Sequence, residues 1–205
     1  AAVYRGNPNP MEEVDEDVAP KPKGLYSACK FWGEKIAEIY REEHGLDYTV
    51  LRPTSVFGLG RGQRGSWSSR LTPIPETPHH MVLPELAALG EPVEMPPNDL
   101  LTDWIYAADA AEAWYCALTV KDPAHRVFNM RSERRRLGEV TAHLQDLLPD
   151  AQITVSSQPV EDPLQLMSNQ RLVEDLGFKA QYTMETGMVD YLNRVRTQAG
   201  LPTVG

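Results

Sequence analysis

The sequence predicts a layered α/β fold in a single domain. Short runs rich in β-branched and aromatic residues alternate with helical segments of about 10 to 15 residues, which is typical of strands joined by helices. The chain has 205 residues, 41% of them hydrophobic and 24% charged, which is enough length for one complete hydrophobic core. The sequence shows no internal repeats.

The first helix is predicted over residues 27–43, because this stretch holds many good helix formers, no proline and one glycine. Gly45 follows it where a helix C-cap is expected. Residues 47–52 then form a short run with β-branched and aromatic residues that Pro53 ends, which indicates a buried strand. A long loop rich in Gly, Arg, Ser and Pro follows over residues 58–78, and loops of this length are usually functional or mobile.

The remaining elements alternate in the same way. A helical pattern over residues 79–89 contains Pro84, which predicts a break or kink there. Strands are predicted at residues 93–95, 103–106, 126–130 and 153–155, and helices at residues 107–119, 137–148, 168–177 and 184–198.

Composition excludes several classes of function. The formal net charge of −9 argues against a nucleic-acid surface, which needs clustered Lys and Arg. One short basic run, made of Arg131, Arg134, Arg135 and Arg136, is interpreted as a solvated helix start rather than a phosphate site. No apolar run approaches the roughly 20 residues of a membrane-spanning helix, so no membrane partner is expected.

Cysteine usage points to a reducing compartment. Cys29 and Cys116 are the two cysteines of the chain, too few for a disulfide scaffold or a four-cysteine zinc site. A cytoplasmic protein without a structural metal is therefore expected.

Tyr26 and Lys30 stand four residues apart at the start of the first predicted helix, so they project from one face. A phenol in water has a pKa of about 10, and an ammonium beside it lowers that value toward a useful range for proton transfer. The ammonium also carries three donors for vicinal hydroxyls such as those of a ribose. The alternative is an ordinary contact on a helix surface.

Several segments together resemble the C-terminal two thirds of an extended short-chain dehydrogenase/reductase, the NAD-dependent epimerase/dehydratase family. The segments follow one another in the same order as in that family. The segments are AVYRG (2–6), YSACKFWGE (26–34), LRPTSVFG (51–58), DWIYAADAAEA (103–113), VFNM (127–130) and VEDLGF (173–178). The second is similar to the family's Tyr-x-x-x-Lys-x-x-x-Glu pattern, and the third to its Arg-Pro-x-x-Val-Tyr-Gly element.

The resemblance implies a fold and a site. It implies the C-terminal part of a Rossmann-like parallel sheet over residues 1–205, with a small α/β substrate lobe at about 58–100 and 131–205. Tyr26 is the implied acid/base, and Lys30 the residue that assists it and holds the nicotinamide ribose of NAD or NADP. Residues 53–56, with Pro53, Ser55 and Val56, are implied to line the nicotinamide.

The family's glycine-rich dinucleotide fingerprint does not occur in these 205 residues. The serine or threonine that partners the catalytic tyrosine in the family would come just before Ala1. We therefore expect the chain to be the C-terminal part of a longer protein, inactive alone and prone to form a homodimer or other homo-oligomer through exposed sheet edges and apolar faces.

Substrate-facing residues are expected at Ser55, Arg61, His79 and His80. The paired histidines are interpreted as a polar helix start rather than metal ligands. Nucleotide-sugar members of the family usually place Asn where Ser55 stands and often Arg where Thr102 stands, so a dehydrogenase or reductase acting on a smaller hydroxy or carbonyl compound is favoured. A nucleotide-sugar epimerase or dehydratase, and a non-catalytic scaffold that keeps the fold, are the alternatives.

Overall fold

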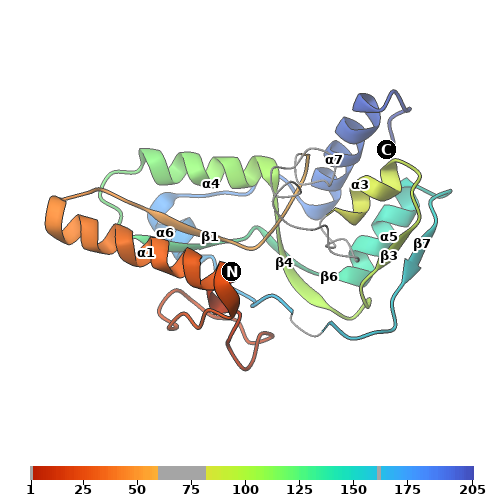
Figure 1. Ribbon diagram of the computed structural model, residues 1–205. Helices are drawn as coiled ribbons and strands as arrows, with labels where there is room; N and C mark the ends of the chain where they lie inside the picture. The colour runs from red at the N-terminus through yellow and green to blue at the C-terminus, as the bar shows by residue number, and fades with distance from the viewer. Residues whose placement is uncertain (1, 60–81, 161–162) are drawn as a thin grey trace.

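The structure, a computed structural model, describes residues 2–59, 82–160 and 163–205. Helices and short strands alternate along them (Figure 1). The helices are η1 (a 3-10 turn, Ala2–Tyr4), α1 (Gly24–His44), α3 (Leu83–Ala88), α4 (Ala107–Thr119), α5 (Leu137–Leu147), α6 (Gln170–Leu176) and α7 (Met184–Gln198). The strands are β1 (Val50–Pro53), β2 (Ser55–Phe57), β3 (Val93–Met95), β4 (Leu101–Tyr106), β5 (Val127–Met130), β6 (Glu133–Arg136) and β7 (Ile153–Val155).

Parallel strand pairs form the framework of the molecule. β1 pairs with β5, with Val50 opposite Val127 and Pro53 opposite Met130. β2 pairs with β4 and β3 with β7, also in parallel, whereas β6 lies antiparallel to β4. Parallel strands need crossover connections, and helices lie between the paired strands in the sequence. The predicted α/β class with parallel sheets is confirmed.

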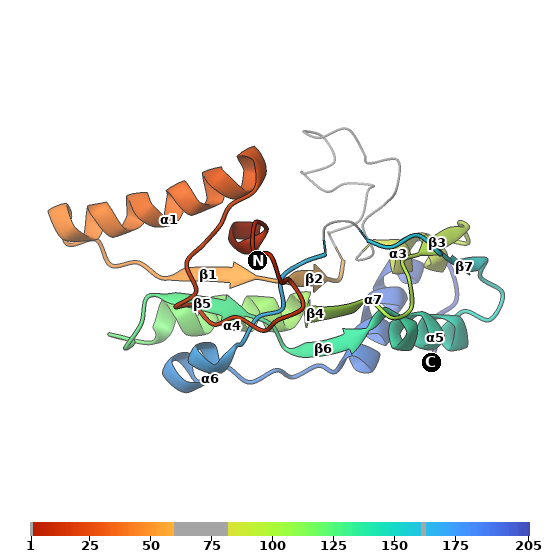
Figure 2. The same ribbon diagram turned by 90° about the horizontal axis from the view of Figure 1, so that it is seen from below.

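The two ends of the molecule have separate hydrophobic cores. In Figure 1, α3, α5 and α7 gather around β3 and β7 at one end, while α1, α4 and α6 flank β1 and β5 at the other. Figures 1 and 2 place α1 and α4 on opposite sides of β1. Successive side chains of β4 belong to different cores, because side chains alternate between the two faces of a strand. Trp104 and Tyr106 are in the first core and Ile105 is in the second.

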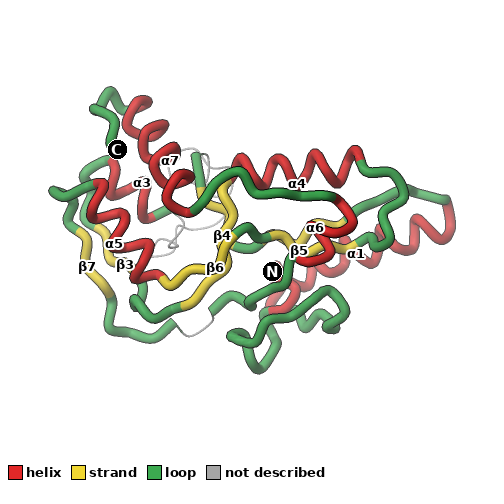
Figure 3. Tube along the Cα trace, turned by 180° about the vertical axis from the view of Figure 1, so that it is seen from behind, coloured by secondary structure: helices red, strands yellow, loops and turns green. Residues whose placement is uncertain are grey.

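The residues predicted as a substrate lobe divide between these ends. Helices α3, α5 and α7 share the first core, with Leu83, Leu144 and Leu192 among its buried members. Helix α6 instead packs against β5 and α4, as Figure 3 shows from behind. Its Leu172 and Leu176 belong to the second core.

Most predicted elements are confirmed with close bounds. Residues 107–119 and 184–198 form α4 and α7, and residues 93–95 and 153–155 form β3 and β7, as predicted. The first helix begins three residues earlier than predicted, at Gly24, and Gly45 ends it in the left-handed conformation with φ 69°.

Two expectations about local structure are corrected. Pro84 does not break a helix, because it stands in the first turn of α3, where its missing N–H would have no helical partner anyway. The rest of that predicted helix, residues 79–81, lies outside the described residues. Ser55–Phe57, where the sequence predicts no strand, forms β2 opposite β4.

The interpretation of the basic run is also corrected. Arg134, Arg135 and Arg136 lie in β6, and the next helix begins at Leu137. Arg134 stands opposite Asp103 of β4 and its Nε donates to Asp103 Oδ1 over 2.8 Å. The Asp103 side chain is fully buried. Arg134 therefore neutralises a buried carboxylate, and the prediction of a solvated helix start is wrong for it. The prediction fits Arg136, which is exposed and is the N-cap of α5.

Helix α1 is the most exposed long helix of the described chain. Ser27 is its one buried residue among 21, and the large side chains of Trp32, Ile36, Ile39 and Tyr40 are exposed. Both cysteines carry free thiols, Cys29 on α1 and Cys116 on α4. In the described ranges, every helix is too short or too polar to cross a membrane.

Candidate functional site

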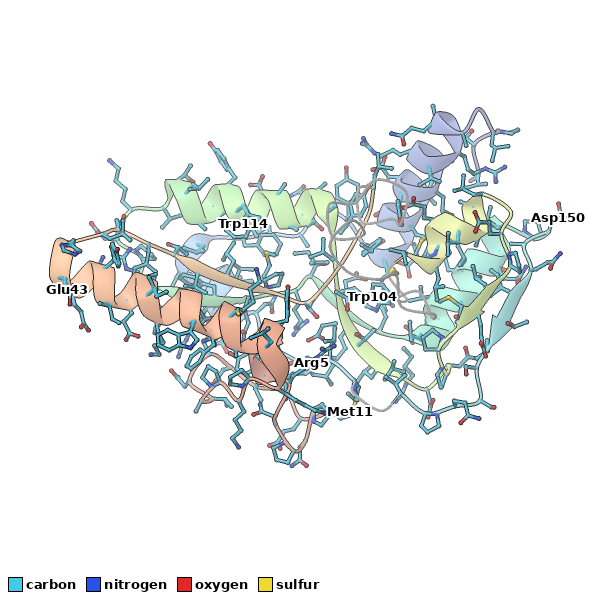
Figure 4. The ribbon with its side chains drawn as sticks, viewed as in Figure 1. Arg5, Met11, Glu43, Trp104, Trp114 and Asp150 are labelled. Atoms are coloured by element: carbon cyan, nitrogen blue, oxygen red, sulfur yellow. The ribbon has the colours of Figure 1, made fainter. Side chains whose placement is uncertain are left out.

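A cavity of about 290 Å³ is lined by residues of β1, α1 and α4. Its lining includes Val3 of η1, Tyr26 and Lys30 of α1, Pro53 of β1 and Trp114 of α4. Figure 4 shows Trp114 on α4, across β1 from the α1 helix. Four elements that are far apart in the sequence therefore meet around one hollow.

Tyr26 and Lys30 lie on the same face of α1, as their spacing predicts. Lys30 Nζ lies 5.4 Å from the centroid of the Tyr26 ring, within the range of a cation–π contact. Tyr26 is 66% exposed, so its phenol is open to a molecule that enters from solvent. The pair can hold a proton and a positive charge side by side at the cavity wall.

The other predicted site residues are placed in different ways. Pro53 lines the cavity with Tyr26 and Lys30. Ser55 is fully buried in β2 opposite Trp104, and Val56 packs against the second hydrophobic core. Arg61, His79 and His80 lie outside the described residues.

Two charged residues of the cavity were not predicted as part of the site. Arg52 precedes Pro53 on β1, and Glu34 follows Lys30 by one turn of α1; both line the cavity. Arg52 Nε donates to Glu34 Oε1 over 3.0 Å and Arg52 Nη2 to Glu34 Oε2 over 2.6 Å. An arginine inside an apolar strand is a signal that a buried partner exists, although the sequence does not say which.

The same arginine belongs to a longer polar network. Arg52 Nη1 donates to Tyr4 Oη, and Tyr4 Oη donates to Asn129 Oδ1 over 3.2 Å. Burial raises the pKa of Tyr4, which keeps this phenol neutral. The backbone N–H of Asn129 donates to Glu16 Oε1 over 2.5 Å, and burial raises the pKa of Glu16. The network ties η1, α1, β1 and β5 together.

No cluster of three or more His, Cys, Asp or Glu side chains suited to a metal ion occurs among residues 2–59, 82–160 and 163–205. The chemistry that this part of the chain offers is a phenol, an ammonium and an apolar-walled cavity.

Comparison with known proteins decides the family. The family model described as NAD dependent epimerase/dehydratase family matches residues 1–130. The chain belongs to this family. Its segments around Tyr26, Pro53, Asp103 and Asn129 fall inside the matched range, so the resemblance predicted from the sequence is confirmed.

Among curated members of the epimerase/dehydratase family, the dTDP-glucose 4,6-dehydratase of Shigella flexneri is 24% identical over 206 residues. The alignment covers 91% of this chain and 53% of that protein. This chain therefore spans about half the length of such a relative.

Solved structures share the fold over nearly the whole chain. A partial consensus L-threonine 3-dehydrogenase superposes with a TM-score of 0.76 at 17% identity, covering 96% of this chain and 63% of that one. The UDP-glucuronic acid 4-epimerase of Bacillus cereus, in complex with UDP-glucuronic acid and NAD, superposes with a TM-score of 0.74 at 16% identity. The match covers 97% of this chain and 60% of that one. These likenesses establish the Rossmann-type epimerase fold.

Proposed function

We propose that the full-length gene product is a nicotinamide-dependent oxidoreductase or epimerase that acts at a hydroxyl or carbonyl carbon. The observation that carries the proposal is the cavity in which Tyr26, Lys30 and Pro53 meet. Membership of the epimerase/dehydratase family supports it.

Tyr26 is the proposed acid/base. In the oxidation direction, Tyr26 Oη takes the proton of the substrate hydroxyl as the hydride leaves the carbon, and it returns a proton to the oxygen in the reverse direction. A cation beside a phenol favours the phenolate, and Lys30 supplies that cation. The apolar walls at Val3, Pro53 and Trp114 limit water near the reacting carbon.

The cavity fits the nicotinamide end of NAD or NADP. Its apolar walls suit a flat ring, and the donors of Lys30 suit the hydroxyls of a ribose. Its volume of about 290 Å³ lies at the lower limit of small-molecule sites, roughly 300–1,000 Å³, so it suits one end of a dinucleotide. When bound, the cofactor takes up or returns the hydride. The name of the family and the NAD-bound epimerase of similar fold favour NAD over NADP.

The proposed substrate is a small hydroxy or carbonyl compound. Ser55 and Thr102 support this class, because they stand where nucleotide-sugar members usually or often have Asn and Arg. Ser55, Arg61, His79 and His80 remain the residues proposed to face substrate. The second candidate is a nucleotide-sugar epimerase or dehydratase, favoured by the likeness to the dTDP-glucose 4,6-dehydratase.

An absorbance assay on the full-length gene product tests the proposal. With NAD or NADP, turnover of L-threonine and related hydroxy compounds is compared with turnover of UDP-glucose and dTDP-glucose. Tyr26→Phe should lower kcat by about 10²-fold or more, whereas Tyr115→Phe, an exposed tyrosine of α4, should leave it unchanged. Unchanged turnover in Tyr26→Phe contradicts the proposed role.

Titration calorimetry with NAD and NADP separates an enzyme from a scaffold that only keeps the fold. Micromolar binding of either cofactor supports the enzyme, and the cofactor that binds more tightly identifies the preference. Absence of heat with both cofactors favours the scaffold.

The proposed assembly is a homodimer or other homo-oligomer in a reducing cytoplasm. The exposed apolar side chains of α1, with Trp32 64% and Tyr40 52% accessible, support association with a second copy. The free thiols of Cys29 and Cys116 suit a reducing compartment. Light scattering of the wild type and of Trp32→Lys checks the assembly.

A further inference from the structure

Lys30 stands between two groups on one face of α1. Tyr26 lies four residues before it and Glu34 four residues after it, and residues four apart are neighbours on a helix. A lysine and a glutamate four residues apart on a helix attract each other, less strongly when the lysine comes first, as here. In the structure, Lys30 Nζ instead lies 5.4 Å from the Tyr26 ring centroid, on the phenol side.

Arg52 binds Glu34, the carboxylate that would otherwise compete with Tyr26 for Lys30. Its two contacts with Glu34, at 3.0 Å and 2.6 Å, engage both oxygens of that side chain. The pair is shielded, because the Arg52 side chain is 6% exposed and that of Glu34 12%. A bidentate guanidinium–carboxylate pair is the strongest of the ordinary ion pairs, so Glu34 is held by β1 rather than offered to Lys30.

Tyr4 holds the guanidinium in this position. The Arg52 guanidinium carbon lies 5.0 Å from the Tyr4 ring centroid, and Arg52 Nη1 donates to Tyr4 Oη. Among the described residues, Tyr4 from η1 and Arg52 from β1 face this row of α1 from other elements. On α1 itself, the charge of Lys35 also acts on Glu34. Helix α4 contributes the uncharged Trp114.

We propose that Arg52 is a positioning residue for the site, which by occupying the Glu34 carboxylate leaves the Lys30 ammonium beside Tyr26. The inference rests on the proposed function, because that function gives Tyr26 and Lys30 their roles in proton transfer. Without Arg52, Glu34 is a carboxylate one turn from Lys30 with no partner on β1, and the ammonium turns to it.

The test uses the full-length gene product with Arg52→Met, Glu34→Gln and the double variant. Arg126→Met is the matched control, because Arg126 pairs with Asp47 over 2.6 Å just before β5 and away from the cavity. Arg52→Met should lower kcat on the order of 10- to 100-fold and move the acidic limb of the pH–rate profile to higher pH. Adding Glu34→Gln should return the acidic limb of the pH–rate profile to its wild-type position and restore most of kcat, since no carboxylate then competes for Lys30.

A purely structural role for Arg52 predicts a different result. The double variant would keep the defect of the single variant, and the limb of the pH–rate profile would stay where it is in the wild type. That outcome overturns the proposal. If Arg52→Met does not fold, Arg52→Lys replaces it, and a smaller shift of the limb in the same direction is expected because a lysine engages one oxygen of Glu34.

A readout without turnover keeps the two proposals distinguishable. In a crystal structure of Arg52→Met, the Lys30 ammonium should lie within hydrogen-bond distance of a Glu34 carboxylate oxygen and away from the Tyr26 ring. If the wild type turns over no substrate, the proposed function fails while this structure still decides the positioning role. A Lys30 ammonium that stays beside Tyr26 in Arg52→Met overturns it.

Discussion

Helices α1 and α7 differ in how much of each helix is buried in the molecule. Helix α1 has 21 residues with Ser27 alone buried, whereas α7 has 15 residues of which six are buried: Met184, Gly187, Met188, Tyr191, Leu192 and Val195. Side-chain contacts of α1 with β1 include the ion pair between Glu34 and Arg52. Helix α7 packs into the first hydrophobic core.

The difference separates stability from positioning. An apolar helix face is stabilised in proportion to the area it buries and tolerates small shifts. A bidentate ion pair fixes two groups within hydrogen-bond distance. Helix α1 carries Tyr26 and Lys30, so the proposed chemistry lies on the helix that buries little and is joined to β1 by an ion pair. Helix α7 adds bonds such as that from Tyr191 Oη to Glu85 to a buried apolar face.

The largest expected effect comes from breaking the α1 ion pair. Arg52→Met leaves the shielded Glu34 carboxylate without its partner, and removing one member of a buried pair costs about 4 kcal/mol. Urea unfolding measures this loss. The double variant Arg52→Met with Glu34→Leu should lose much less, because no orphaned charge remains; an equal loss in both would mean that the pair itself stabilises the fold.

A slightly smaller effect is expected in α7. Leu192 is fully buried, and truncating such a side chain to alanine costs about 3 kcal/mol through lost burial and the cavity that remains. Its counterpart on α1, Ile36→Ala, removes a side chain that is 48% exposed and should change the unfolding free energy by less than about 0.5 kcal/mol. A large loss in Ile36→Ala would reveal that a second copy covers α1.

The start of α7 offers a third comparison. The Thr183 hydroxyl accepts from the backbone N–H of Thr186 and completes a capping box, whereas the N-cap of α1, Lys23, makes no side-chain cap bond. Thr183→Ala should therefore cost about 1 kcal/mol in thermal or urea unfolding. Thr183→Ser, which keeps the hydroxyl, should restore most of that loss.

The smallest effect concerns pH. A hydrogen bond from its own backbone N–H, followed by contacts with Thr183 and Arg135, holds the pKa of Glu185 below its ordinary value. A carboxyl whose pKa is depressed in the folded state stabilises the fold above its unfolded value, about 4.3 for Glu, and loses that contribution as pH falls through the folded value.

Glu185→Gln should accordingly be less stable than the wild type at neutral pH. The difference in unfolding free energy should narrow as the pH falls below about 4. A difference that stays constant from pH 7 to pH 3 would contradict the assigned cause. Helix α1 has no acidic residue in its first turn, so it offers no equivalent dependence.

Local patterns predicted most of the fold. The alanine-rich run of α4 and the β-branched Ile153–Val155 needed no tertiary information. Strand β6 was missed because Glu-Arg-Arg-Arg has no apolar alternation. It pairs antiparallel with β4, where Arg134 stands opposite Asp103 and bonds to it. Strand β2 was missed because three residues after Pro53 carry too little pattern to separate a strand from a corner.

The sequence predicted the part of the site whose residues lie close together along the chain. Tyr26 and Lys30 are one helical turn apart, so the helix alone brings them together. Arg52 and Glu34 are 18 positions apart on different elements, and their pairing depends on how α1 lies on β1. Trp114 enters the cavity from α4, and no spacing in the sequence signals that approach.

The most direct test of the central claim is a crystal structure of the full-length gene product with NAD. The account predicts the nicotinamide ring in the cavity against Pro53, with Lys30 at the ribose hydroxyls, Tyr26 Oη open toward the ring, and Arg52 still paired with Glu34. A nicotinamide bound elsewhere, or Lys30 paired with Glu34 while Tyr26 points away from the ring, would contradict it.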